Sequence, residues 1–107
     1  MSKTELLSQL ISLANPKMAD HSKRFFKTGA GQYGEGDDFL GIRVPDQRKI
    51  ARKFKSISLD EIAELLKSNF HEVRLTSVFI LVLKYQNGDT HYQKEIFDFY
   101  VNRLEYR

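Results

Sequence analysis

The sequence predicts an all-α protein in which antiparallel helix pairs stack as an α-solenoid. Apolar residues recur at helical spacing through most of the 107 residues. Helix-start signals recur at short intervals, and no two-residue hairpin turn separates alternating apolar and polar runs. Five or six helices of roughly 10–18 residues, joined by short turns, would build such a stack.

The first two helices are marked by their N-terminal residues. Ser2 and Glu5 have the spacing of a capping box, in which the serine caps the helix and the glutamate reaches back to it. Asn15 and Pro16 predict a second helix, with asparagine as the N-cap and proline at the first helical position. We expect that helix to end at Thr28-Gly29.

The stretch Phe39–Phe54 concentrates positive charge on one predicted helix. Pro45 suits the first turn of that helix, and Ile50 would face the core together with Phe54. The basic side chains in this stretch are Arg43, Arg48, Lys49, Arg52 and Lys53. Two interpretations remain open for them: a basic face that is simply solvated, or a surface that binds phosphates and releases counterions.

Three further helices are expected after this stretch. Ser58 and Glu61 form a second capping box, ahead of a short amphipathic helix. The segment His71–Tyr85 could hold a strand at Val78–Leu83, but its length favours a buried helix. Its predicted buried stripe consists of Leu75, Val78, Phe79 and Val82.

The last helix is predicted to begin with a third capping box, formed by Thr90 and Gln93. It carries two adjoining apolar rows. One row consists of Tyr92, Ile96 and Tyr100, and the other of Phe97, Val101 and Leu104. So much apolar surface on one helix favours self-association through it.

Composition excludes several classes of protein. The chain has no cysteine, which excludes disulfides and thiolate metal sites. The longest apolar run, Val78–Leu83, is too short to cross a bilayer, and residues 1–5 lack the profile of a signal peptide. We therefore expect a cytoplasmic protein. A net charge of +3 permits an anionic partner without requiring one.

No motif in the chain builds a complete active site. Gly29 to Gly34 matches the dinucleotide pattern G-x-G-x-x-G, but no strand precedes it and no helix opens on it. The three histidines are too scattered to predict a metal site. We therefore expect no metal and no cofactor.

The order of three motifs resembles the AlkD-like family of DNA alkylation-repair glycosylases. These are Asn15-Pro16, then Lys23–Lys27, then F-L-G-I-R-V-P-x-x-R from Phe39 to Arg48. The unit Ser58–Tyr85, whose second helix opens on H-E-V-R, resembles a HEAT repeat. The resemblance covers essentially the whole chain, as the N-terminal part of a single, longer HEAT-like domain.

This resemblance implies a DNA repair function. Such a protein is a hydrolase that cleaves the N-glycosidic bond of cationic alkylated purines, such as 3-methyladenine and 7-methylguanine, in duplex DNA and without a metal. The family's catalytic carboxylate would lie beyond Arg107, so no catalytic residue is assigned in this chain. The residues expected to contact DNA are Phe25, Lys27, Arg43, Arg48, Lys49 and Arg52.

An alternative function is a non-catalytic HEAT-like α-solenoid that binds DNA or protein. The sequence immediately beyond Arg107 would discriminate the two, since a W-D-x-x-D motif there favours the enzyme. A protein-interaction domain with no DNA role would leave the basic side chains between Arg43 and Lys55 without a task, and its binding would be insensitive to salt.

Overall fold

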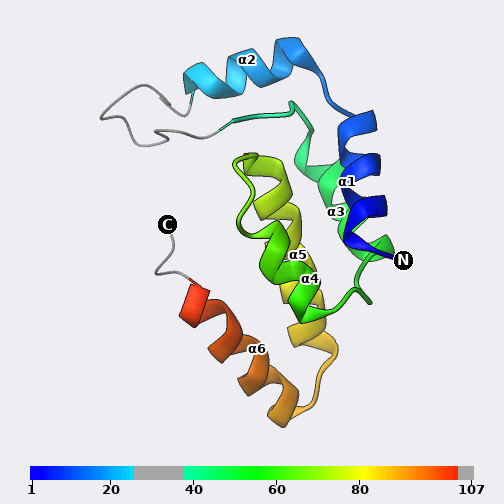
Figure 1. Cartoon of the computed structure of the whole chain (residues 1–107), viewed down its shortest axis with the longest axis vertical. Helices are drawn as coiled ribbons and strands as arrows, with labels where there is room; N and C mark the ends of the chain where they lie inside the picture. The colour runs from blue at the N-terminus through cyan, green and yellow to red at the C-terminus, as the bar shows by residue number, and fades with distance from the viewer. Residues whose placement is uncertain (26–37, 104–107) are drawn as a thin grey trace.

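A computed structural model describes residues 1–25 and 38–103, and this part of the chain is all-α (Figure 1). Its helices are α1 (Lys3–Ser12), α2 (Pro16–Phe25), α3 (Val44–Lys53), α4 (Leu59–Leu65), α5 (His71–Asn87) and α6 (Thr90–Arg103). The predicted fold class is confirmed. None of the described helices is long and apolar enough to span a bilayer.

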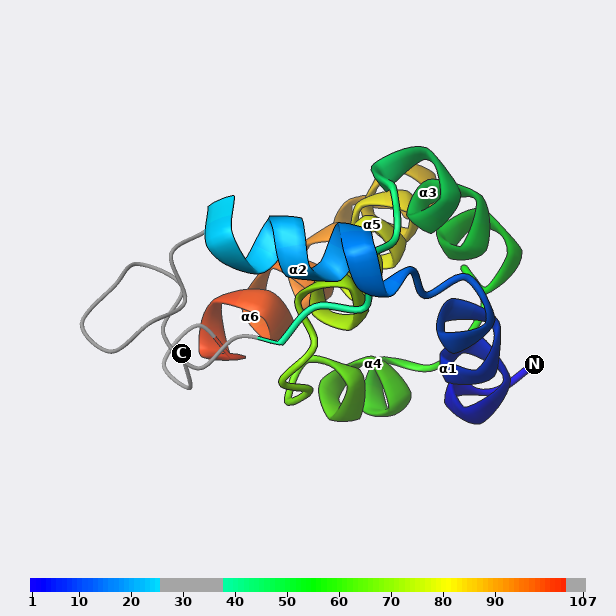
Figure 2. The same ribbon diagram turned by 90° about the horizontal axis from the view of Figure 1, so that it is seen from above.

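Helix α5 is the centre of the arrangement. It packs against α3, α4 and α6, while α1 packs against α3 and α4. Seen from above, α3 and α5 lie side by side, with α1 and α4 along one side of them (Figure 2). The core between these helices includes Leu6, Leu10, Ile50, Phe54, Ile62, Val73, Ile80 and Ile96. Packed helix neighbours of this kind are compatible with stacked helix pairs; the solenoid itself stays a prediction.

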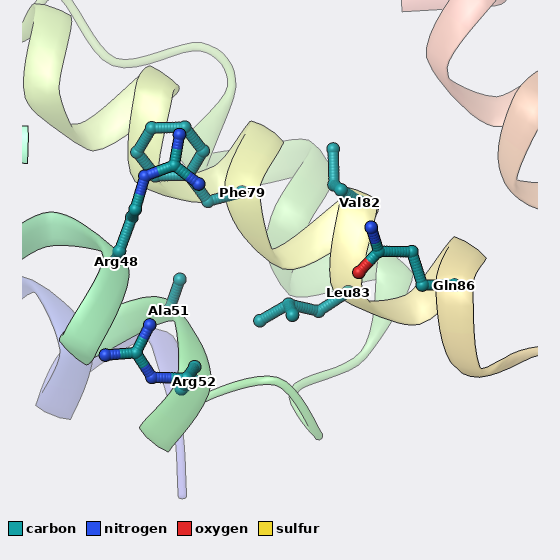
Figure 3. A pocket seen from close by; sticks show the side chains of 7 residues that line it. All are labelled: Arg48, Ala51, Arg52, Phe79, Val82, Leu83 and Gln86. Carbon is teal, nitrogen blue, oxygen red and sulfur yellow. The ribbon is translucent and has the colours of Figure 1, made fainter. Parts of the chain in front are cut away.

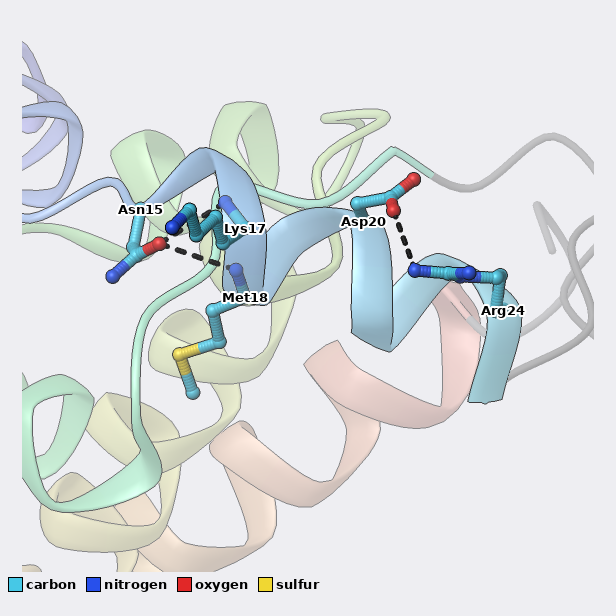
Figure 4. Close-up of polar contacts among 5 residues, drawn as sticks. All are labelled: Asn15, Lys17, Met18, Asp20 and Arg24. Carbon is cyan, nitrogen blue, oxygen red and sulfur yellow. Dashed lines mark hydrogen bonds and ion pairs between the residues drawn. The ribbon is translucent and has the colours of Figure 1, made fainter.

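Three of the predicted helix caps are confirmed. The Ser2 and Ser58 hydroxyls accept hydrogen bonds from the backbone N–H groups three residues later, at 3.3 and 3.2 Å. The Asn15 side-chain oxygen accepts from the backbone N–H of Lys17 at 3.1 Å and of Met18 at 3.2 Å (Figure 4). The predicted end of the second helix at Thr28-Gly29 lies outside the described residues.

The predicted cap of the last helix is wrong by one residue. Thr90 is already helical, and the Asp89 carboxylate accepts from the backbone N–H of Tyr92 at 2.8 Å. Gln93 does not reach back to its own helix start but donates to the carbonyl oxygen of Tyr85 at 2.9 Å. A carboxylate at this position is favoured because it also meets the positive end of the helix dipole.

The helix at His71–Asn87 is confirmed, but its most buried stripe differs from the predicted one, in which Leu75, Val78 and Phe79 are half-buried and Val82 is exposed. The buried side chains are Glu72, Val73, Thr76, Ser77, Ile80 and Leu81, whereas Val82 is 46% exposed. The Ser77 hydroxyl donates to the carbonyl oxygen of Val73 at 2.9 Å, so its burial leaves no unsatisfied donor.

The two apolar rows of α6 have different surroundings. Ile96 is buried, and Tyr92 and Tyr100 pack partly against the core. Phe97 and Val101 are 61% and 41% exposed. Leu104, the third member of the second row, lies outside the described residues.

Candidate nucleic-acid interface

A buried carboxylate holds the segment that leads into α3. The Glu72 side chain is 3% exposed and accepts hydrogen bonds from three consecutive backbone N–H groups. The distances are 2.9 Å to Leu40, 2.9 Å to Gly41 and 3.4 Å to Ile42. Successive N–H groups that converge in this way form a concave anion site, which here is filled by the protein's own carboxylate. We call this arrangement the Glu72 clasp.

Only glycine fits the middle of the clasped segment. Gly41 has a φ of +81°, and an added Cβ would collide with the carbonyl oxygen of Asn15 and lie 2.7 Å from the backbone nitrogen of Ala19. The backbone N–H of Asn15 in turn donates to the carbonyl oxygen of Leu40 at 2.8 Å. The segment is therefore wedged between the start of α2 on one side and α5 on the other.

A second buried polar residue completes the approach to α3. Gln47 is 2% exposed, and its side-chain amide donates to the carbonyl oxygen of Ile42 at 2.9 Å. Sequence reasoning did not assign a role to Gln47 or Glu72. Both residues could have been recognised as polar residues on the buried side of a helix. Gln47 lies one turn before the buried Ile50, and Glu72 lies one turn before the buried Thr76.

The predicted start of α3 is confirmed. Arg43 is extended and is the N-cap, and Pro45 lies in the first turn. Ile50 and Phe54 are buried, so the opposite side of the helix faces water. The predicted DNA-contacting cations on this side are Arg43, Arg48, Lys49 and Arg52, and all four are exposed. We call these four residues the α3 basic surface.

Few negative charges oppose this surface. Asp46 is the one acidic residue of α3, and its carboxylate lies 3.5 Å from the Nε of Arg43, whose side chain remains 69% exposed. Among the described residues, neither Lys49 nor Arg52 forms an ion pair. The surface is therefore cationic rather than a set of alternating, self-neutralising pairs.

Two of the arginines border a shallow pocket between α3 and α5. Arg48 and Arg52 are one helical turn apart, and Figure 3 shows both beside the pocket with Phe79 and Gln86 opposite them. The guanidinium carbon of Arg48 lies 4.4 Å from the centre of the Phe79 ring. This stacking restricts the arginine while leaving its N–H groups available to an anion. The pocket has a volume of about 100 Å³.

The remaining predicted contacts are not tested. Phe25 is the last residue of α2, and Lys27 lies outside the described residues. Within the described ranges, no group of three His, Asp or Glu side chains is arranged to hold a metal ion. The arrangement on α3 offers positive charge and hydrogen-bond donors.

Comparison with protein families gives a match to the model described as DNA alkylation repair enzyme, over residues 6–107. Neither curated proteins nor solved structures gave a match. The family match includes the clasped segment, the α3 basic surface and every described helix from α2 onward. The chain therefore belongs to the DNA alkylation repair enzyme family.

Proposed function

We propose that this chain binds duplex DNA through the α3 basic surface, as part of a glycosylase that hydrolyses the N-glycosidic bond of cationic alkylated purines such as 3-methyladenine and 7-methylguanine. Membership of the family supports a role in alkylation repair. The observation that carries the DNA contact is the set of four exposed cations on α3 and at its N-cap, in a helix with a single acidic residue.

The geometry favours phosphates as the anions that meet this surface. Arginine presents a planar fork of N–H donors that matches phosphate oxygens, and each contact releases condensed counterions from the duplex. The Glu72 clasp fixes the segment just before Arg43, so this residue is placed before DNA arrives. A contact of this kind loses less conformational entropy on binding than one from a flexible loop.

The glycosylase reaction also requires a carboxylate, which the α3 basic surface does not contain. A base that already carries a positive charge is a good leaving group, so catalysis needs a carboxylate to stabilise the oxocarbenium-like sugar. Asp46 lies beside Arg43 of this surface, and the nearby Glu72 is buried in its clasp. From the resemblance to AlkD-like glycosylases, we propose that the chain supplies DNA grip and that the catalytic carboxylate comes from beyond Arg107.

The DNA contact is tested by the salt dependence of binding. Fluorescence anisotropy of a labelled duplex is measured between about 50 and 200 mM salt for the wild type, Lys49→Ala and Arg52→Ala. Each variant should reduce the slope of log K against log salt by about 0.9 if it removes one phosphate contact. Lys67→Ala, just after the end of α4, is the matched control, because Lys67 is also exposed and its ammonium lies 3.7 Å from the Glu64 carboxylate.

Equal slopes for the control and the α3 variants would contradict the proposed contact. Duplex binding without salt dependence, or no binding at all, would remove the DNA role and favour a protein-interaction domain.

The glycosylase step needs its own assay. Release of methylated purines from alkylated duplex DNA is measured for residues 1–107 and for the full-length product of the gene. Release by the full-length product alone supports the proposal, and Arg43→Ala in that protein should lower the release. Salt-dependent binding with no release by either protein would instead favour a non-catalytic solenoid that binds DNA.

A further inference from the structure

A second recess lies beside the pocket of Arg48 and Arg52. It has a volume of about 290 Å³ and is lined by Lys55 and Ser56 after α3, by Leu83, Lys84 and Asn87 on α5, and by Tyr92 on α6. Leu83 lines both cavities, so the two lie next to each other along α5. Two ammonium groups, a hydroxyl, an amide and a phenol therefore gather where the α3 basic surface ends. We call this the Lys55–Lys84 recess.

Lys84 is an incompletely compensated cation. It is partly buried, and this loss of hydration lowers its pKa below the usual lysine value. Among the described residues neither Lys84 nor Lys55 forms an ion pair, and no acidic residue lines the recess. A cation in such a place gains more from a bound anion than a fully hydrated lysine does.

The far wall of the recess is fixed in place. The ring of Tyr92 packs so closely on Gly88 that an added Cβ there would lie 2.7 Å from its Cδ2 atom. The Asn87 side-chain amide donates to the carbonyl oxygen of Leu83 at 2.8 Å. Burial raises the pKa of Tyr92, and the negative charge of Glu95, one turn further along α6, raises it as well. The Asp89 carboxylate lies at the start of the same helix, where it accepts a hydrogen bond from the backbone N–H of Tyr92 at 2.8 Å.

We propose that the Lys55–Lys84 recess binds a backbone phosphate of the duplex, which extends the DNA contact from α3 to the C-terminal end of α5. The inference rests on the DNA-binding function proposed above. Compact ammonium groups bind phosphate as point charges, and the recess adds hydroxyl donors beside them. Because the recess adjoins the pocket of Arg48 and Arg52, one strand of DNA could follow both in succession.

The decisive variant is Lys84→Met, which keeps the length of the side chain and removes its charge. Duplex affinity of the 107-residue chain should be roughly tenfold lower at 50 mM salt, with a salt slope reduced by about 0.9. The thermal midpoint should stay equal or rise, because the folded state no longer holds a poorly hydrated ammonium. Lys84→Arg should restore the wild-type slope.

Lys94→Met is the matched control, since Lys94 is exposed on α6 and its ammonium lies 3.0 Å from Asp98, away from both cavities. If Lys84→Met behaves like this control while Arg52→Ala lowers the slope, the recess does not bind phosphate and the α3 contact stands. If the wild type shows no salt-dependent duplex binding, the proposed function fails and this inference fails with it.

Discussion

The two flanks of helix α5 face water with opposite chemistry. On the flank toward α3, Arg48 and Arg52 border one cavity, and Lys55 and Lys84 line the next. On the flank toward α6, a groove of about 180 Å³ has no charged residue in its lining. Its lining residues are Val78, Leu81, Val82, Tyr85, Ile96, Phe97 and Tyr100.

The two flanks would bind a partner for different physical reasons. Exposed cations are well hydrated, so the α3 flank is stable in water without DNA and gains affinity mainly from counterion release. Exposed apolar surface costs about 25 cal/mol per Å², so the α6 flank is stabilised by any apolar contact that covers it. Binding to the first flank should therefore weaken with salt, and binding to the second should not.

The largest loss of stability is expected from a substitution in the Glu72 clasp, which holds the segment that leads into α3. Glu72→Ala removes the acceptor of three backbone N–H groups in the protein interior, and should lower the free energy of unfolding by about 3 kcal/mol. Urea denaturation followed by circular dichroism measures this loss. Glu72→Gln is the control, since it keeps one acceptor oxygen and should lose less. An unchanged urea midpoint for Glu72→Ala would show that the clasp does not hold α3 to α5.

A smaller gain of stability is expected from a substitution of Thr76, which lies one helical turn after Glu72 on the buried side of α5. Thr76 is 0% exposed, and within the described residues its hydroxyl has no hydrogen-bond partner. Thr76→Val keeps the shape of the side chain and removes the unsatisfied group, which should raise the free energy of unfolding by about 1 kcal/mol. Ser77→Ala should not stabilise the fold in the same way, because that hydroxyl already donates to a carbonyl. A destabilised Thr76→Val would mean that the hydroxyl is hydrogen-bonded in solution.

The smallest effect on stability is expected on the α6 flank. A change in self-association would distinguish this apolar flank from the basic α3 flank. Phe97 is 61% exposed, so Phe97→Ser should change the free energy of unfolding by less than about 0.5 kcal/mol. Self-association through α6 stays a prediction, and the variant should reduce it in sedimentation velocity over a range of concentrations. Lys94→Ser, on the same helix, is the control. A wild type that stays monomeric at every concentration and salt level would refute this prediction.

The sequence predicted the elements whose causes are local. Ser2, Asn15 and Ser58 cap helices through backbone groups two or three residues away, so their spacing was sufficient. The cap of α6 was misplaced because Asp89 and Thr90 are both capping residues, and only the structure shows which hydroxyl or carboxylate is used. The buried stripe of α5 was misassigned because this helix is apolar around most of its circumference and has packed neighbours on several sides.

The candidate site also has one part that could be predicted from the sequence and two parts that could not. The α3 basic surface was predictable because its four members lie within ten residues of one another in the chain. The Glu72 clasp joins residues 31 positions apart, and the Lys55–Lys84 recess draws its lining from three segments. Local spacing in the sequence does not predict these long-range contacts, because they depend on how α3, α5 and α6 pack.

The Glu72 clasp also changes how the connection before α3 responds to thermal motion. Amide hydrogens in connections usually exchange quickly with solvent, because they lack stable acceptors. Those of Leu40, Gly41 and Ile42 are bonded to a buried carboxylate on another helix. They become free to exchange only when the segment and α5 separate, so their deuterium uptake follows tertiary opening rather than local loop motion.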